Sequence, residues 1–303
     1  MSLRPFIRRA INNVFFRLIY ETDRHNGVAE LLEILGSIIN GFALPLKEQH
    51  KQFLAKVLLP LHKVTGIANF HPQLSYCVTQ FLEKDANLAP KIISSIIALW
   101  PQISSKKELM FLSELEEILD RVQPRNLGDA QTILFSRLAA CIHSPHFQVS
   151  ERALFILNNS VIVRFISANR TALLPLLADA LLSNTHLIGT EPYELDLPEG
   201  PGPIWMPGAS TRAHGHWNQS IVELTADVLK LFAEMDQSIM RTCKDRFDAN
   251  VATEEESKRA RRAAWRAVTA AAKPALQKYN EEFESYDRKR RADLSDPPHS
   301  IRK

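Results

Sequence analysis

Residues 28–39, VAELLEILGSII, decide the fold class of this chain. Apolar side chains recur there at spacings of three and four residues, which places them along one face of an α-helix. The helix follows Asn26-Gly27 and stops before Gly41 and Pro45, residue types that favour helix ends. The stretch therefore predicts an amphipathic helix whose buried stripe is formed by Val28, Leu31, Leu32, Leu35, Ile38 and Ile39.

Similar helical patterns lie on both sides of this segment. A third helix is expected from about Leu46 to Pro60, and an earlier one buries Ile7, Ile11, Val14, Phe15 and Leu18. Further helix-length segments, each bounded by Pro, Gly, Asn or Ser, cover residues 71–85, 90–101, 105–122, 128–144, 146–159 and 171–184. Helices thus alternate with short polar breaks.

Two of these segments echo each other. His71-Pro72-Gln73-Leu74-Ser75 and His146-Phe147-Gln148-Val149-Ser150 share the pattern H-x-Q-[LV]-S and begin 75 residues apart. That distance is close to two units of an armadillo or HEAT repeat, each of about 40 residues. A helix pair cannot bury its apolar face alone, so we predict an all-α, HEAT/armadillo-like helical-repeat solenoid. The competing fold, a globular helical bundle, needs fewer and longer helices.

Composition narrows the class of protein further. The 303 residues are 45% hydrophobic, and a formal charge of +3 is too small to indicate specific nucleic-acid binding. Cys77, Cys141 and Cys243 are far apart and lack metal-ligand spacing, which indicates a reduced intracellular compartment. Neither a secretory signal nor a stretch of about 20 apolar residues is present, so we expect no membrane association.

The pattern predicts four regions. HEAT-like repeats occupy residues 1–184, and a Pro/Gly-rich insertion loop occupies residues 185–215. C-terminal repeat helices occupy residues 216–250, beginning at His216-Trp217-Asn218. Residues 251–303 are a charged tail, Ala-rich and helical at first and expected to be disordered beyond Tyr286.

Few residues suggest a catalytic or metal-binding site. His214-Gly215-His216 lies in the insertion without a nearby Cys or carboxylate at ligand spacing, so a solvated loop is favoured over a metal site. The acidic run Ser113-Glu114-Leu115-Glu116-Glu117 is best interpreted as the solvated face of an amphipathic helix. Phosphate-binding, nucleophile-elbow and zinc-helix motifs are missing. We therefore expect a binding protein without a cofactor or metal, not an enzyme.

A basic run near the C-terminus leaves two interpretations open. Lys258-Arg259-Ala260-Arg261-Arg262, joined by Arg288-Lys289-Arg290-Arg291, is compatible with a nuclear localisation signal or a weak polyanion contact. The same residues are compatible with a solvated helix in which Glu254, Glu255 and Glu256 pair with the basic side chains.

A candidate binding surface combines apolar and basic residues. Ile34 lies off the main stripe but shares a face with Leu31 and Ile38, and Lys47 and His50 lie together at the start of the next helix. Such a surface could hold a short peptide with hydrophobic anchors and acidic flanks. Core packing of the isoleucines and a solvated Lys and His explain the same residues.

Long collinear blocks carry a resemblance to a known family. Residues 6–64, FIRRAINNVFFRLIYETDRHNGVAELLEILGSIINGFALPLKEQHKQFLAKVLLPLHKV, resemble the B-prime regulatory subunits of protein phosphatase 2A. The blocks HPQLSYCVTQFLEKD, KELMFLSELEEILD, SPHFQVSERAL and HWNQSIVELTADVLKLFAEM continue the resemblance in order. It extends from Leu3 to about Phe247.

The resemblance implies a function. A B-prime subunit is a HEAT-like solenoid that joins the phosphatase scaffold and catalytic subunits, does no chemistry itself, and recruits substrate proteins through a short L-x-x-I-x-E motif. It implies a location in the cytoplasm and nucleus. Arg4, Ile34, Ile38, Lys47 and His50 match family residues that line the peptide groove. The runner-up is a generic HEAT-type adaptor unrelated to phosphatases.

Three departures from the family pattern carry expectations of their own. Members of the family have further repeats before the position that corresponds to Met1, so we expect part of the groove and docking surface to be missing and Ile7, Ile11 and Phe15 to be exposed. The insertion should lengthen one loop without disturbing its neighbours, and the tail after Phe247 has no clear counterpart. Lys47 and His50 are both expected to be exposed.

Overall fold

The structure is a computed structural model that describes residues 3–22, 26–185 and 216–295. It divides into two compact units, Met1–Asp245 and Arg246–Lys303. Within the described ranges every regular element is a helix. The insertion predicted at 185–215 lies outside the described residues, apart from Thr185, which ends a helix.

The helices are short and follow each other closely through the first unit. In chain order they are α1 (Leu3–Tyr20), α2 (Val28–Asn40), α3 (Glu48–Phe53), η1 (Leu54–Leu58), η2 (Leu59–Lys63), η3 (Ile67–Asn69), α4 (His71–Lys84), η4 (Ala86–Leu88), α5 (Ala89–Ala98), α6 (Ser105–Asp120), η5 (Pro124–Asn126), α7 (Ala130–Ile142), α8 (Phe147–Asn158), α9 (Ser160–Ala168), α10 (Arg170–Thr185) and α11 (Gln219–Met235). The last helix, α12 (Gln237–Ser295), begins in the first unit and forms most of the second.

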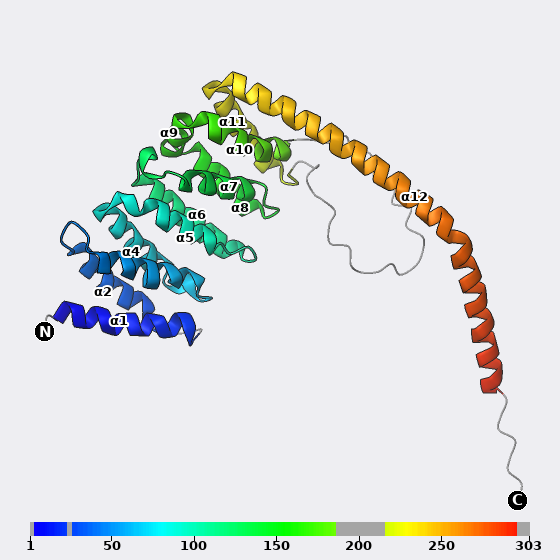
Figure 1. The fold of residues 1–303 in the computed structure, drawn as a ribbon, viewed down its shortest axis with the longest axis horizontal. Helices are drawn as coiled ribbons and strands as arrows, with labels where there is room; N and C mark the ends of the chain where they lie inside the picture. The colour runs from blue at the N-terminus through cyan, green and yellow to red at the C-terminus, as the bar shows by residue number, and fades with distance from the viewer. Residues whose placement is uncertain (1–2, 23–25, 186–215, 296–303) are drawn as a thin grey trace, which may run out of the picture. The chain divides into compact units, whose positions relative to one another are not determined.

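Helices of the first unit stack in two layers, as Figure 1 shows. One layer runs through α2, α4, α6, α8 and α11, and the other through α1, η2, α5, α7 and α10. Each helix packs against its neighbours in its own layer, while consecutive helices alternate between layers. This arrangement confirms the prediction of an all-α helical-repeat solenoid.

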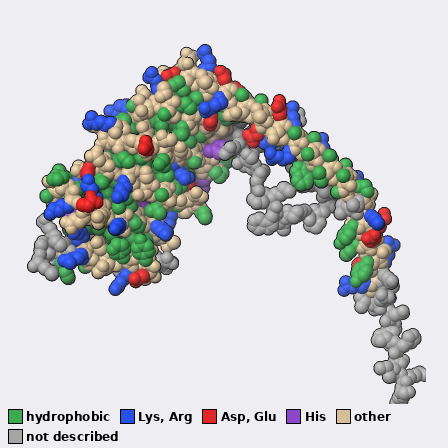
Figure 2. Space-filling model, viewed as in Figure 1, with side chains coloured by type: hydrophobic (Ala, Val, Ile, Leu, Met, Phe, Trp, Pro, Cys, Tyr) green, Lys and Arg blue, Asp and Glu red, His purple; other side chains and the backbone are tan. Residues whose placement is uncertain are grey.

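A continuous apolar core lies between the two layers. Its largest fully buried side chains include Phe81, Phe111, Phe135 and Phe165, which come from α4, α6, α7 and α9. On the face shown in Figure 2, acidic, basic and hydrophobic side chains are interspersed. The fold therefore depends on apolar burial between repeats.

The repeated H-x-Q-[LV]-S motif has a structural counterpart. Both copies open a helix of the same layer, α4 at His71 and α8 immediately after His146. The serines of the two copies are buried and donate hydrogen bonds, Ser75 to the Glu117 carboxylate at 2.9 Å and Ser150 to the Ile142 carbonyl oxygen at 2.7 Å. The Ser75 hydrogen bond thus joins α4 to α6, and the Ser150 hydrogen bond joins α8 to the end of α7.

Two helices differ from the predicted pattern. The third helix was expected from about Leu46 to Pro60, but α3 begins at Glu48 and its helical path continues through a π-turn and a 3₁₀-turn to Lys63. Pro60 has no N–H to continue the α-helical hydrogen bonds, so the winding changes around it. The second difference is α9, which lay between the predicted segments. Its start is marked by Asn159, whose side chain accepts a hydrogen bond from the Val161 N–H.

The expected exposure of one face of α1 is wrong. Ile11 and Phe15 are buried and Ile7 is partly buried, because this face packs on α2, η1 and η2. Phe6, Phe16 and Tyr20 are exposed instead. Periodicity had placed Ile7, Ile11 and Phe15 on the buried stripe, which is correct; the expectation of exposure came from the comparison with family members that have further repeats.

The tail is helical farther than the sequence predicted. Disorder was expected beyond Tyr286, whereas α12 continues to Ser295, with Glu284 and Arg288 forming an i,i+4 ion pair.

In the described part of the chain, no single helix is long and apolar enough to cross a membrane. Helices α9 and α10, which are bent by 118° relative to each other, have the length and apolar composition of a membrane span only when they are taken together.

Candidate functional site

Helix α2 places two isoleucines on its outer side. Its buried stripe includes Val28, Leu32 and Leu35, which face the core. Ile34 is 48% exposed and Ile38, one turn later, is half-buried. Since residues four apart share a face of a helix, the pair forms a small apolar surface beside the core.

Helix α4 fixes the position of α2 through close backbone contact. A Cβ atom added to Gly36 would lie 2.9 Å from Cε1 of Tyr76, so the tyrosine ring packs directly on the α2 backbone. The Lys84 ammonium donates to the Asn40 carbonyl oxygen at 2.8 Å, at the C-terminal end of α2. Tyr76 is itself 48% exposed and was missed by the sequence prediction. The signal was a glycine inside an apolar helix, which often marks such an approach.

A basic cluster forms where α1 meets α3. The Arg8 guanidinium donates to Gln49 Oε1 at 3.4 Å, and Arg8 and Lys47 both lie near enough to His50 to lower its pKa electrostatically. Lys51, on the same helix, is held by Asp85 at 2.7 Å. Lys47 forms no ion pair among the described residues and is exposed, as predicted. It remains available to an acidic ligand.

His50 is buried, which contradicts the expectation that it is exposed. Its side chain is stacked on Phe42 with ring centroids 3.8 Å apart, and the residue is only 8% exposed. Burial, together with the charges of Arg8 and Lys47, lowers the pKa of the imidazole below its usual value of 6.5. His50 is therefore neutral at physiological pH, and the positive charge of the cluster comes from Arg8 and Lys47.

The predicted site residues lie on consecutive helices. Ile34 and Ile38 lie on α2, and Phe42, which follows α2, stacks on His50 of the next helix. Arg4 lies in α1 one turn before Arg8, but its side chain is outside the described residues. Arg8 is a contributor that the sequence prediction missed. We call the set Arg8, Ile34, Ile38 and Lys47 the α2 surface.

The prediction that the acidic run in α6 is a solvated face holds for Glu117, which is exposed, but is wrong for Glu114. Glu114 is fully buried and receives hydrogen bonds from His62 Nε2 at 3.0 Å and His71 Nε2 at 2.9 Å. His62 Nδ1 also donates to the Leu59 carbonyl oxygen at 2.9 Å. The Leu59 carbonyl oxygen and the Glu114 carboxylate oxygen can only accept hydrogen bonds, so both ring nitrogens of His62 must donate. His62 is therefore protonated and forms an ion pair with Glu114.

The pKa values of this cluster follow from the ion pair. Burial alone would raise the pKa of Glu114, but the charge of His62 and the hydrogen bonds from His62 and His71 hold it at about 2. Burial would likewise lower the pKa of His62, but the attraction of Glu114 outweighs it and raises the pKa above 6.5. The three side chains join η2, α4 and α6.

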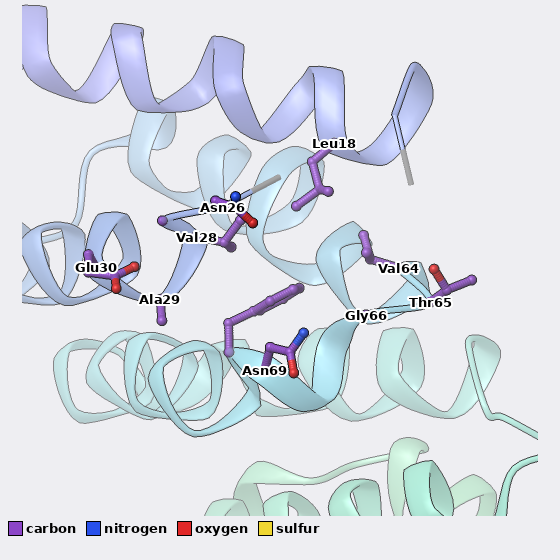
Figure 3. A pocket seen from close by; sticks show the side chains of 11 residues that line it. Leu18, Asn26, Val28, Ala29, Glu30, Val64, Thr65, Gly66 and Asn69 are labelled. Carbon is purple, nitrogen blue, oxygen red and sulfur yellow. The ribbon is translucent and has the colours of Figure 1, made fainter. Parts of the chain in front are cut away.

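A cavity lies at the other end of α2, between the end of α1 and η3. It has a volume of about 580 Å³ and is shown in Figure 3. Asn26, Thr65 and Asn69 contribute polar groups, and Glu30 is the ionisable side chain of the lining. The lining offers no nucleophile paired with a base, so it does not suggest catalysis.

A second cavity, of about 390 Å³, gathers more titratable groups. Its lining includes Glu108, Arg137, Cys141, His143 and His146. Burial raises the pKa of the Cys141 thiol to about 12, so it is protonated and a poor nucleophile at neutral pH. Trp100 contacts Glu108 and Arg137: its Nε1 donates to Glu108 at 3.0 Å, and the Arg137 guanidinium lies 5.6 Å from its ring centroid. Among the described side chains no cluster of three metal-ligating groups exists.

The first basic run of the tail is helical and partly paired. Lys258 contacts Glu254 at 3.2 Å and Arg259 contacts Glu255 at 4.0 Å, both at i,i+4 spacing. These pairs support the solvated-helix interpretation, although paired surface cations remain accessible to a partner.

Comparisons with known proteins identify relatives over most of the chain. The family model described as "Protein phosphatase 2A regulatory B subunit (B56 family)" matches residues 1–187 and 199–272. The delta isoform of the 56 kDa regulatory subunit of serine/threonine-protein phosphatase 2A from Oryctolagus cuniculus is 47% identical over 249 residues, which are 82% of this chain and 38% of that protein. The B' eta isoform of the 59 kDa regulatory subunit from Arabidopsis thaliana is 44% identical over 266 residues, 88% of this chain and 47% of that protein. The chain spans less than half the length of these relatives.

Proposed function

Because this chain belongs to the B56 family of protein phosphatase 2A regulatory B subunits, we propose that it is a regulatory subunit that binds the phosphatase scaffold and catalytic subunits. Its relatives are named as regulatory subunits, which favours a binding role over catalysis. A solenoid supports that role because stacked helices offer an extended surface for partners.

We propose further that the α2 surface recruits substrate proteins through short acidic-hydrophobic motifs of the L-x-x-I-x-E type. Ile34 and Ile38 offer apolar contact for the hydrophobic anchors of such a peptide. Arg8 and Lys47 offer positive charge for its acidic positions. The observation that carries the proposal is an exposed isoleucine on α2 and an exposed, unpaired lysine at the start of the next helix.

Fluorescence anisotropy with a labelled L-x-x-I-x-E peptide tests the proposal. Ile34→Asp places a charge where an apolar anchor should bind, and Lys47→Glu reverses the charge that meets the acidic position. Each is expected to weaken binding by about tenfold or more, equivalent to about 1.4 kcal/mol. A peptide in which the motif Glu is replaced by Lys should show the same loss with the unaltered chain.

Two matched variants control for surface and charge. Ile133 on α7 is 46% exposed, so Ile133→Asp repeats the Ile34 substitution on another helix. Lys91→Glu repeats the charge reversal on α5, where the lysine is exposed. Both should leave peptide affinity unchanged. Equal affinity of the chain for the L-x-x-I-x-E peptide and a scrambled peptide would refute the recruitment role and favour an adaptor unrelated to phosphatases.

We propose a location in both cytoplasm and nucleus. The accessible basic run at Lys258, Arg259 and Arg261 supports a nuclear address. A fluorescent fusion in which these three residues are replaced by Gln should lose its nuclear fraction; an unchanged distribution would contradict the address.

A further inference from the structure

The second unit carries an apolar stripe that no described residue of that unit covers. Trp265, Val268, Tyr279, Phe283 and Tyr286 of α12 are 56–65% exposed. Figure 2 shows hydrophobic side chains between the charged ones along this helix. Aromatic residues in such numbers are unusual on a solvated helix.

The stripe has the spacing of a coiled-coil seam. Together with Ala272, its members are spaced 3, 4, 7, 4 and 3 residues apart between Trp265 and Tyr286, which keeps them on one face over three heptads. Arg261 and Arg290 follow on the same face at either end and are exposed. Pro274 falls on the opposite face, so its ring does not enter the seam. The apolar seam is thus bounded at both ends by a cation.

The order of the stripe is symmetric about its centre. Trp265 and Tyr286 lie equally far from the midpoint between residues 275 and 276, as do Val268 and Phe283. Ala272 and Tyr279 form the third pair of this kind, a small residue with a large one. A two-fold axis through this midpoint would place each residue opposite its counterpart on an antiparallel copy of the same helix.

We propose that α12 pairs with α12 of a second copy of this chain as an antiparallel coiled coil over residues 264–287. Trp265 packs against Tyr286 of the second copy, Val268 against Phe283, and Ala272 makes room for Tyr279. Aromatic pairs of this type add to the burial of apolar area. The pairing goes beyond the proposed function and does not depend on it.

Charge selects the antiparallel orientation. Between residues 258 and 273 every charged side chain is basic, whereas residues 281–287 hold Glu281, Glu282, Glu284 and Asp287. A parallel pair would set each like-charged half against itself. The antiparallel register instead sets the basic half of each helix along the acidic segment of the other. Arg261 and Arg290 then face each other and repel, which limits the paired segment.

The antiparallel register of α12 uses residues that lie outside the family match. The family match ends at residue 272, so Tyr279, Phe283 and Tyr286 lie beyond it. Each of the three pairs takes one partner from this segment and one from the matched part.

Sedimentation velocity of the full chain across a roughly hundredfold concentration range tests the pairing. We expect a reversible shift from the 34.4 kDa monomer toward twice that mass. Val268→Asp and Phe283→Asp each place a charge inside the seam and should weaken dimerisation by about tenfold or more. Ala270→Asp adds the same charge on the face opposite the seam, where the residue is exposed, and serves as the matched control. Circular dichroism checks that helix content is unchanged.

Disulfide trapping tests the orientation. A mixture of Trp265→Cys and Tyr286→Cys chains should form mixed dimers under mild oxidation, whereas either variant alone should cross-link poorly. A chain that stays monomeric at all concentrations would overturn the proposal. So would dimers that survive Phe283→Asp, or efficient cross-linking of Trp265→Cys with itself, which indicates a parallel pair.

Discussion

Glu114 shows how one buried residue fixes three segments of the solenoid. Replacing it by Gln keeps the size of the side chain but removes the charge that His62 faces. Because the imidazolium is then buried without a counter-charge, Glu114→Gln should lower the free energy of unfolding by about 3–5 kcal/mol in urea denaturation. Asp120→Asn, which also removes a carboxylate charge but at an exposed position on the same helix, should alter it by less than about 0.5 kcal/mol. Equal stability of the two variants would contradict the ion pair.

The same cluster predicts how stability depends on pH. The pKa of Glu114 is held at about 2, below its unfolded value of 4.5, so its contribution is present above pH 4.5 and is lost as pH falls toward 2. The pKa of His62 is raised, so its contribution is present below pH 6.5 and is lost as pH rises through the folded value. The stability difference between the unaltered chain and Glu114→Gln should therefore be largest between about pH 4.5 and 6.5. A flat difference from pH 3 to 9 would contradict this assignment.

Lys47 and His50 should behave differently on truncation. Lys47→Ala removes an exposed, unpaired side chain and should leave the melting temperature unchanged. His50→Ala removes a buried ring stacked on Phe42 and should lower stability by about 1–3 kcal/mol. Thermal melting followed by circular dichroism measures both. A melting temperature for His50→Ala equal to that of Lys47→Ala would show that the stack contributes nothing.

At the scale of residues, the sequence located only part of the candidate site. The outward position of Ile34 followed from helical spacing, whereas Ile38 was placed on the buried stripe and is half-buried. Arg8 could not be found that way because its neighbour Gln49 comes from another helix, 41 residues on. The burial of Glu114 was hidden for the same reason, since His62 and His71 lie 52 and 43 residues away.

At the scale of elements, the contact between α2 and α4 depends on a missing side chain. Gly36→Leu would push against the Tyr76 ring, which a Cβ atom alone would approach to 2.9 Å. We expect a loss of about 1–3 kcal/mol in the free energy of unfolding. The double variant Gly36→Leu/Tyr76→Ala should recover most of that loss because the space is vacated. Additive losses in the double-mutant cycle would show that the two residues do not meet.

Which elements the sequence could predict depends on how each helix is stabilised. Helices with an apolar stripe and clear stops, such as α2 and α6, were placed within a few residues. The path from α3 to η2 was not, because Pro60 redirects the winding without ending the helical path. Helix α9 was missed because nine residues between two longer helices gave too short a window for the periodicity to be recognised.

At the scale of the whole molecule, the repeat architecture was predictable because the same requirement recurs along the chain. Each helix pair leaves an apolar face that only the next pair can bury, and the resulting pattern recurs throughout the first unit. The function was less accessible, because a solenoid surface has no motif as local as a catalytic one. Its assignment depends on family membership and on the α2 surface.

The central claim is that this chain is a regulatory subunit of protein phosphatase 2A. The most direct test is to mix the purified chain with the phosphatase scaffold and catalytic subunits and to follow co-elution by size-exclusion chromatography, with the human delta isoform as the positive control. Our account predicts a complex that contains all three proteins. A chain that is folded and helical but elutes alone, under conditions where the control assembles, would contradict it.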